Sequence, residues 1–391
     1  MKDNGATIYS NFTGNPFVDA GIAALCALNQ KDNPQQISKG DLINSANYIS
    51  DLYPNWPKLR NLFTQNCTPL QPSYKNKEIR KMKYKAEHEA LLQKITPASS
   101  SGSCIACGTR EANAPRIFRE KYPLTGSGDL LNYFSFFESG FPICAACAFA
   151  VQLSPLYLIS NDGRLFLAHS HNTRIMLNLA QDALTHIKGF AATGASPTYF
   201  CPVQFSRNDI NECVVKLARY LISKSEAQLI PPIIRLYSFI NSGRLNLLNL
   251  VDLPTEVFSF IEQARLGGLN RNLNELFDNA NRNLYYRLVA QESINYFFLK
   301  LKERKIIGGW ELFELYLKEV ERMKKGRLEA LKKVGQNLYH CLEDTHFKRL
   351  GELETDDYRT FMITLNRMQK EALIWEIDDY LLLFPEGVSW K

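Results

Sequence analysis

The sequence lacks the short motifs that mark the common nucleotide-binding and hydrolytic enzymes. It has no P-loop, no glycine-rich dinucleotide fingerprint, no GxSxG elbow and no HExxH metal motif. Its acidic doublets, Asp356 with Asp357 and Asp378 with Asp379, are adjacent residues, and adjacent side chains do not face each other on a helix. No catalytic constellation is evident, and we expect a protein that is not an enzyme.

Long apolar runs and secretion features are also missing. No apolar run approaches the roughly 20 residues that a helix needs to cross a bilayer. The longest candidate, near 229–240, is interrupted by Pro231, Pro232 and Arg235. The N-terminus shows no positively charged region followed by an apolar stretch and a cleavage site. The cysteine count is nine, an odd number, which argues against a secreted disulfide scaffold. We therefore expect a cytoplasmic protein with no membrane partner.

Proline is absent between Pro254 and Pro385, and this absence divides the chain. After about Thr255, apolar residues recur at helical spacing and the density of charge rises. A chain of 391 residues is also too long for one comfortable core. We therefore predict an N-terminal domain over residues 1–255 and a C-terminal α-helical bundle over residues 256–391.

The N-terminal part mixes helical and strand patterns. Apolar runs at 156–159 and 165–167 flank an Asn-Asp-Gly turn, which is typical of a β-hairpin. Amphipathic helices are predicted over 174–184 and 210–223, and a further helix over 20–28 with Asp19 as its cap. The expected fold class is α+β, with a metal module inserted at about 100–150 in the N-terminal domain.

Two cysteine pairs stand out from the rest of the chain. They read Cys104-Ile-Ala-Cys107 and Cys144-Ala-Ala-Cys147. A C-x₂-C pair can bind one tetrahedral zinc ion, and two pairs complete a closed Cys₄ site, which is usually structural. Gly108 follows the first pair, where a knuckle turn often needs a positive φ. We predict a zinc-ribbon-like module with these four ligands; unrelated thiols or two redox pairs are the alternatives.

Positive charge is concentrated in two places, although the net charge is only +6. The stretch 75–85 carries six basic residues and one acid, a density that attracts a phosphate backbone. An ordinary solvated helix face or a flexible arm is the alternative reading. A second, one-signed group lies in the predicted bundle. The predicted nucleic-acid contacts in these two places are Lys75, Lys77, Lys81, Lys83 and Lys85, and Arg322, Lys324, Lys325 and Arg327.

Two histidines lie one residue apart, directly after the predicted hairpin. His169 and His171 share one face of a strand, so they could bind a metal or a phosphate. No carboxylate accompanies them in a known metal motif. A nuclease that uses these histidines and a carboxylate is therefore an alternative without strong support.

The N-terminal string Tyr9-Ser-Asn-Phe-Thr-Gly-Asn-Pro-Phe-Val-Asp-Ala-Gly-Ile-Ala-Ala-Leu25, followed by the two cysteine pairs, resembles the CXXC–CXXC family of CRISPR-associated proteins. These are large subunits of type I-B Cascade, an RNA-guided DNA surveillance complex. The likeness covers residues 1 to about 215 by motif. The helical C-terminal third is similar only in general character.

The resemblance implies a subunit without catalytic activity. Such a subunit holds the 5′ handle end of the guide RNA, reads the protospacer-adjacent motif (PAM) in double-stranded DNA and helps to open the target, while base pairing reads the sequence. Its C-terminal bundle resembles the small subunits that steady the open strands. The implied partners are guide RNA, target DNA, the backbone and handle-binding subunits, small subunits, and a helicase-nuclease or a transposition factor.

The polar turn before the first predicted helix is a further candidate contact with RNA or a backbone subunit, because its amides can approach phosphate closely. A simple helix-capping turn is the alternative. The predicted contact residues are Asn11, Thr13, Gly14 and Asn15. For the whole chain, the alternative function is a stand-alone zinc-ribbon nucleic-acid-binding factor outside CRISPR.

Overall fold

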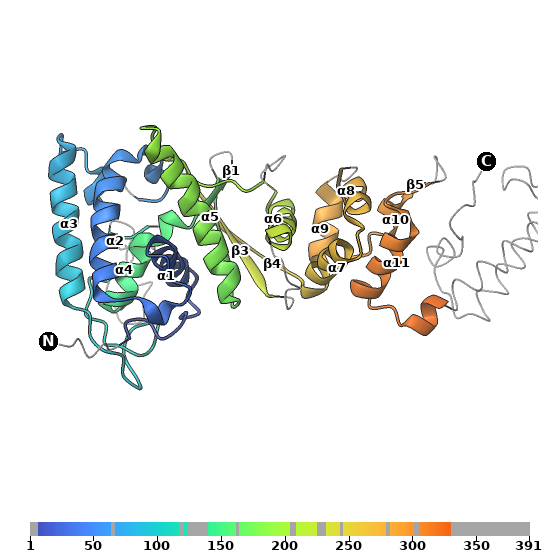
Figure 1. The fold of residues 1–391 in the computed structure, drawn as a ribbon, viewed down its shortest axis with the longest axis horizontal. Coiled ribbons are helices and arrows are strands. Elements are labelled where there is room, and N and C mark those ends of the chain that lie inside the picture. Colours follow the sequence, from blue (N-terminus) through green and yellow to red (C-terminus); the bar gives the residue numbers. More distant parts are fainter. Residues whose placement is uncertain are drawn as a thin grey trace, which may run out of the picture. The chain divides into compact units, whose positions relative to one another are not determined.

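The computed structural model describes residues 7–63, 67–116, 121–123, 140–161, 164–203, 209–224, 232–242, 245–278, 282–300 and 305–329 (Figure 1). The chain forms two compact units. The first unit contains residues 1–217 and 232–252, and the second contains residues 218–231 and 253–391. Among the described residues, no helix is both long and apolar enough to span a membrane.

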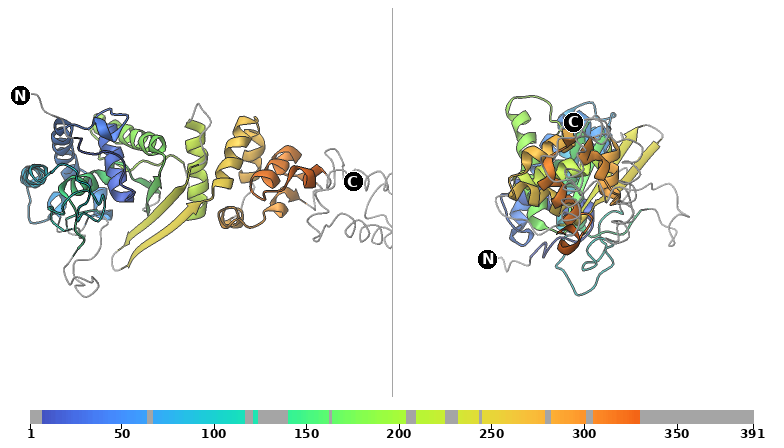
Figure 2. Two further views of the ribbon diagram at one scale, coloured as in Figure 1. Left: turned by 90° about the horizontal axis from the view of Figure 1, so that it is seen from below. Right: turned by 90° about the vertical axis from the view of Figure 1, so that its right-hand side faces the viewer.

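The first unit packs helices around a small antiparallel sheet, so the α+β prediction is confirmed (Figures 1 and 2). The sheet has the order β1-β2-β3-β4. Short 3₁₀ turns lie at 34–36, 53–55, 57–61, 68–70 and 154–156. The described helices are α1 (Pro16–Leu28), α2 (Lys39–Leu52), α3 (Lys77–Gln93), α4 (Ala145–Leu153) and α5 (Thr173–Ala192), with the first half of α6 (Ile210–Lys224), whose residues from 218 on are assigned to the second unit. The strands are β1 (Ile159–Asn161), β2 (Arg164–Ser170), β3 (Ile234–Ser242) and β4 (Leu245–Leu253).

The predicted hairpin is confirmed, with a shorter first strand. Strand β1 pairs antiparallel with β2, with Ile159 opposite Phe166 and Asn161 opposite Arg164. Residues 154–156 form a 3₁₀ turn instead of extending the strand. Strands β3 and β4 were not predicted: the apolar residues at the start of β3 were considered only as part of the interrupted apolar run near 229–240, and no element was assigned to the residues of β4. In the structure, β3 pairs antiparallel with β2, and His169 lies opposite Arg235.

Helix α1 is the central element of the first unit. Its residues from Val18 to Ala27 are all buried, and it packs against α4, α5 and β2. Small side chains permit this, since the sequence Gly-Ile-Ala-Ala-Leu-Cys-Ala lets neighbouring backbones approach. The closest approach is at Gly21: a Cβ there would lie 1.7 Å from the carbonyl oxygen of Ala150 in α4.

The start of α1 differs from the prediction. The helix begins at Pro16 rather than at Ala20, and its N-cap is Asn15, whose Oδ1 accepts from the backbone N–H groups of Phe17 and Val18. Proline suits this first position because its missing N–H would have no partner there. Asp19 is therefore not the cap. It lies in the first turn and is 1% exposed.

Buried tyrosines tie the surrounding helices to α4. Tyr53 donates its hydroxyl hydrogen bond to the carbonyl oxygen of Gln152 at 2.7 Å. Tyr84 of α3 donates to Oε1 of the same glutamine at 2.8 Å. Next to them, His88 is 2% exposed, and burial lowers the pKa of its imidazole to about 3. Hydrogen bonds from buried tyrosine hydroxyls to Gln152 therefore fix the position of the aromatic core of the first unit.

The described part of the second unit is mainly helical, as predicted. It comprises α7 (Thr255–Leu266), α8 (Asn270–Asp278), α9 (Arg282–Ala290), α10 (Asn295–Phe298) and α11 (Gly309–Glu319). One expected helix is interrupted: β5 (Leu299–Lys300) and β6 (Lys305–Ile306) pair antiparallel after α10. Gly308 adopts a left-handed conformation with φ 73° and is the N-cap of α11. Residues 330–391 of the predicted bundle lie outside the described residues.

The crossing of α1 and α4 gives a first prediction. We expect Gly21→Ala to lower the free energy of unfolding by about 1–3 kcal/mol or more, because the new methyl group overlaps the Ala150 carbonyl. Gly189→Ala in α5 is the matched control, since nothing lies within 4 Å of its added Cβ. Alanine is the better helix former by about 0.5–1 kcal/mol, so the control keeps or gains stability.

Urea denaturation followed by far-UV circular dichroism measures both variants. Equal unfolding midpoints for Gly21→Ala and wild type would mean that the two helices can separate without cost. That result contradicts the close packing described here.

Candidate metal centre and nucleic-acid contacts

The four cysteines of the two C-x₂-C pairs come together in the first unit. The sulfur atoms of Cys104, Cys107, Cys144 and Cys147 all lie within 4.8 Å of one another. Cys107 is partly exposed, and the other three are buried. Four sulfur ligands at this spacing can hold one metal ion in a closed site, as the sequence predicted.

The first pair lies on a tight turn whose two sides are joined by backbone hydrogen bonds. Backbone hydrogen bonds join Gly102 N to Gly108 O at 2.8 Å and Cys104 N to Arg110 O at 3.0 Å. Gly108 has φ 64°, which favours glycine, and its N–H donates to the carbonyl oxygen of Cys104 at 2.9 Å. At Gly102, a Cβ would lie 2.3 Å from the backbone of Arg110. The two glycines allow this knuckle to form.

The second pair is positioned by the start of α4. Cys144 is the N-cap of this helix, and its Sγ accepts from Cys147 N at 3.5 Å. Cys147 lies one turn into the helix and is 1% exposed. The Sγ atoms of Cys107 and Cys144 are 3.9 Å apart. The turn at 104–108 thus provides two sulfur atoms, and the start of α4 provides the other two, around a common centre.

The sulfur atoms share their protons unequally. Hydrogen bonds with Cys104, and then with Cys144 and Cys147, hold the pKa of the Cys107 thiol far below its usual range. Hydrogen bonds with Cys104, Cys107 and Cys144 raise the pKa of Cys147 far above its usual range. Four thiolates this close repel one another, and a bound cation removes that repulsion. The donor set therefore fits a divalent metal that prefers sulfur, as zinc does.

A buried arginine forms a hydrogen bond with the N-terminal segment near the cysteine cluster. Arg110 is 5% exposed; its Nε donates to Thr96 O at 2.8 Å and its Nη2 donates to Ile8 O. The neighbouring Tyr9 donates its hydroxyl hydrogen bond to Ala146 O at 2.7 Å. Residues just before the Thr13–Asn15 turn are therefore held against the cysteine module.

The turn before α1 has a structural role that the sequence did not reveal. Oδ1 of Asp19 accepts from Thr13 N at 2.6 Å and from Thr13 Oγ1 at 2.8 Å, and Oδ2 accepts from Gly14 N at 2.9 Å. Gly14 has φ 84°. Asn15 uses its Oδ1 as the helix cap. Asn11 and Gly14 are exposed, and Thr13 and Asn15 are half-buried.

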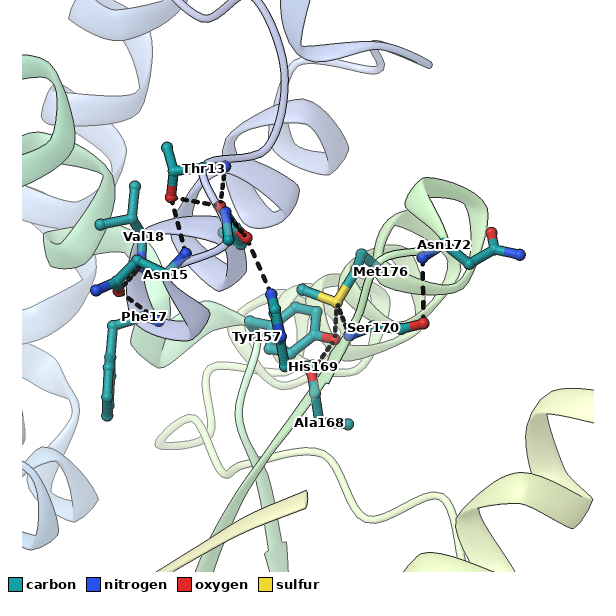
Figure 3. Close-up of polar contacts among 12 residues, drawn as sticks. Thr13, Asn15, Phe17, Val18, Tyr157, Ala168, His169, Ser170, Asn172 and Met176 are labelled. Carbon is teal, nitrogen blue, oxygen red and sulfur yellow. Dashed lines mark hydrogen bonds and ion pairs between the residues drawn. The ribbon is translucent and has the colours of Figure 1, made fainter. Parts of the chain in front are cut away.

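The same carboxylate reaches a strand 150 residues away. Oδ2 of Asp19 lies 2.9 Å from Nε2 of His169 on β2 (Figure 3). Sequence reasoning found no carboxylate partner for this histidine, because Asp19 was assigned to a helix cap. The missed signal was the aspartate inside the apolar run of α1, since a buried charge needs a partner.

The predicted basic stretch forms helix α3, and its lysines do not all have the same surroundings. Lys77 Nζ donates to Asn55 Oδ1 at 3.0 Å, and Lys81 Nζ lies 2.5 Å from Asp51 Oδ1. Lys83 Nζ lies 4.0 Å from the centre of the Tyr74 ring. Lys75 and Lys85 are exposed and have no partner among the described residues. These two are the best placed for an external phosphate.

The four predicted basic contacts in the second unit are exposed. Arg322 forms an ion pair with Glu256, and Lys325 Nζ lies 3.7 Å from Glu329 Oε1. Lys324 and Arg327 lie in the same short segment, where Arg327 N donates to Lys324 O at 2.9 Å. The positive charge of this segment is thus partly balanced by glutamates, which the run Lys324-Lys325-Gly326-Arg327 did not indicate.

The turn that carries the first pair, the start of α4 and the four converging sulfur atoms form a four-cysteine cluster that could hold one metal ion, on an α+β unit. Residues 98–158, which include all four cysteines, match the family model described as CRISPR-associated protein (Cas_CXXC_CXXC). This match supports a CRISPR-associated role. Neither a curated protein nor a solved structure matches the chain.

The cysteine cluster gives a second prediction. We expect one equivalent of metal, with the properties of zinc, to co-purify with the reduced chain. We expect Cys144→Ser to lose this metal and to lower the free energy of unfolding by more than about 3 kcal/mol. This loss is only part of the roughly 10–16 kcal/mol with which structural zinc binds. Cys201→Ser, at an exposed cysteine outside the cluster, is the control.

Elemental analysis and thermal denaturation measure these effects. A folded, unoxidised preparation without metal contradicts the assignment, and so does a Cys144→Ser variant as stable as Cys201→Ser.

Proposed function

We propose that this chain is the non-catalytic large subunit of a type I-B Cascade complex. In this role it holds the 5′ handle end of the guide RNA, recognises the PAM in double-stranded DNA, promotes unwinding and stabilises the open strands. It also helps to recruit a helicase-nuclease or a transposition factor. The observation that carries the proposal is the family match over 98–158, which coincides with the four-cysteine cluster.

The distribution of the basic residues supports a division of labour between the units. Lys75, just before helix α3, and Lys83 and Lys85 within it are exposed in the first unit. We assign these residues to the phosphates of the PAM-side duplex, because lysine contacts to phosphate supply affinity without reading sequence. The exposed segment 322–327 of the second unit is assigned to the open strands. Zinc, in the four-cysteine site, has a structural part only.

The turn at 13–15 can serve assembly as well as structure. Asp19 fixes the backbone of Thr13 and Gly14, and the cap bond fixes Asn15. A rigid, partly exposed turn presents its remaining polar groups in one geometry, which lowers the entropic cost of binding. We therefore assign Asn11 and this turn to contacts with guide RNA or a backbone subunit.

Assembly is the direct test of this function. Co-expression with type I-B backbone subunits and guide RNA should place the chain in one ribonucleoprotein peak on sizing, at one copy per guide RNA. A matched co-expression without guide RNA should leave the chain free. If the chain stays free in both experiments and binds unrelated nucleic acids alone, it is a stand-alone zinc-ribbon factor and the proposal is wrong.

The lysines of α3 allow a quantitative test in the assembled complex. Lys75→Gln combined with Lys85→Gln should lower the log–log salt slope of duplex binding by roughly 0.9 for each lost phosphate contact. Affinity should fall equally for all PAM sequences. Lys188→Gln, at an exposed lysine of α5 in the same unit, is the control.

Binding is measured by fluorescence anisotropy between 50 and about 200 mM salt, a range over which phosphate contacts dominate the change. An unchanged slope for the double variant assigns α3 to a solvated surface. A change in PAM preference alone means that these lysines read bases.

A further inference from the structure

The buried carboxylate of Asp19 controls the chemistry of His169. Asp19 is 1% exposed and accepts from Thr13 and Gly14 as well as lying 2.9 Å from His169 Nε2. Those other donors keep the carboxylate in place (Figure 3). When this carboxylate is ionised it can only accept hydrogen bonds, and Nε2 of His169 is then the donor of the pair. In the neutral ring, Nδ1 then holds a lone pair.

This lone pair is available. Among the described residues, Nδ1 of His169 has no hydrogen-bond partner, and it is not among the buried side-chain atoms that lack one. The residue is 8% exposed overall, so the ring is largely covered but not fully enclosed. A histidine that donates one ring N–H to a carboxylate and presents the other nitrogen is the usual arrangement of a metal ligand.

A second imidazole lies beside it. His171 follows the end of β2 and is exposed. Its ring centre is 5.7 Å from that of His169, with the ring planes 71° apart. Two imidazoles that share a tetrahedral ion through N–metal bonds of 2.0–2.1 Å have their centres about 5 Å apart. The observed 5.7 Å is close to this separation, and the exposed His171 side chain has no hydrogen-bond partner among the described residues.

The surrounding charges permit a cation here. Arg235 lies opposite His169 in the β2–β3 register, but its guanidinium binds both carboxylate oxygens of Asp252, at 2.6 and 2.7 Å. Its positive charge is therefore compensated on the neighbouring strand. The carboxylate of Asp19 lies 2.9 Å from His169 Nε2, and a carboxylate on one ring nitrogen is the usual partner that orients a metal-ligating imidazole.

We propose that His169 and His171 form an open, two-imidazole site for a divalent first-row transition cation, with Asp19 as the residue that positions His169. The site is separate from the four-cysteine centre. Water, or an oxygen donor from a partner molecule, fills the remaining coordination positions. The proposal rests on the free chain alone and is independent of assembly with guide RNA.

Isothermal titration with Ni²⁺ tests the site, because nickel binds imidazole well. The protein is the full chain without a histidine tag, with its four-cysteine site already loaded with zinc. We expect one Ni²⁺ to bind wild type, and His171→Ala to weaken this binding at least tenfold while leaving zinc content and melting temperature unchanged. The matched control is His186→Ala, at a histidine of α5 that lies near Thr198, and it should bind Ni²⁺ like wild type.

Asp19→Asn tests the positioning role. An amide in place of the carboxylate no longer fixes the ring proton on Nε2, and we expect a 10- to 100-fold loss of Ni²⁺ affinity, roughly the effect typical of such partners. Circular dichroism checks that the Asp19→Asn variant is folded. If this variant is unfolded, the His171→Ala result alone decides the proposal. No Ni²⁺ binding to wild type, unchanged binding by His171→Ala, or an equal loss in His186→Ala overturns the site. A folded Asp19→Asn variant with wild-type affinity overturns the role of Asp19.

Discussion

The close crossing of α1 and α4 is the constraint on which the first unit depends. The backbone of Ala150 occupies the space that a side chain would need at Gly21, so the two helices are in direct backbone contact. Helix α4 begins at Cys144, and α1 begins at the turn that Asp19 organises. The metal centre and the Asp19–His169 pair therefore lie at the ends of two helices that cannot move independently.

This arrangement relates the chemistry of the cysteines to the geometry of the turn. Cys144 is both a candidate metal ligand and the N-cap of α4, and Tyr9 links the N-terminal segment to Ala146 in the same helix. A metal that holds Cys144 also fixes the start of α4, and α4 in turn supports α1. A structural ion can thus determine the shape of a surface that it does not touch.

The cysteine ligands could be predicted because their signal is local: a C-x₂-C spacing has few other uses when it occurs twice. The β1–β2 hairpin was also predicted, from its turn residues. The Asp19–His169 pair was not, since it joins residues 150 positions apart and Asp19 looked like an ordinary helix cap. Strand β3 was missed because Pro231 and Pro232 stand before it in an apolar run that was considered only as a membrane candidate, and no element was assigned to the residues of β4. Lys77 and Lys81 looked free in the sequence, whereas their partners come from the 3₁₀ turn at 53–55 and from helix α2.

The separation of the two cysteine pairs has a consequence for how the chain can vary. The cluster brings together two cysteine pairs that are separated along the chain by 36 residues, 108 to 143, and so closes a loop in the sequence. The entropy of closing a loop grows only with the logarithm of its length, so doubling this one costs about 0.6 kcal/mol. The cysteine site therefore tolerates long insertions between its halves, while a single added carbon at Gly21 does not fit. Length variation in this chain should accumulate between the pairs and spare the helix crossing.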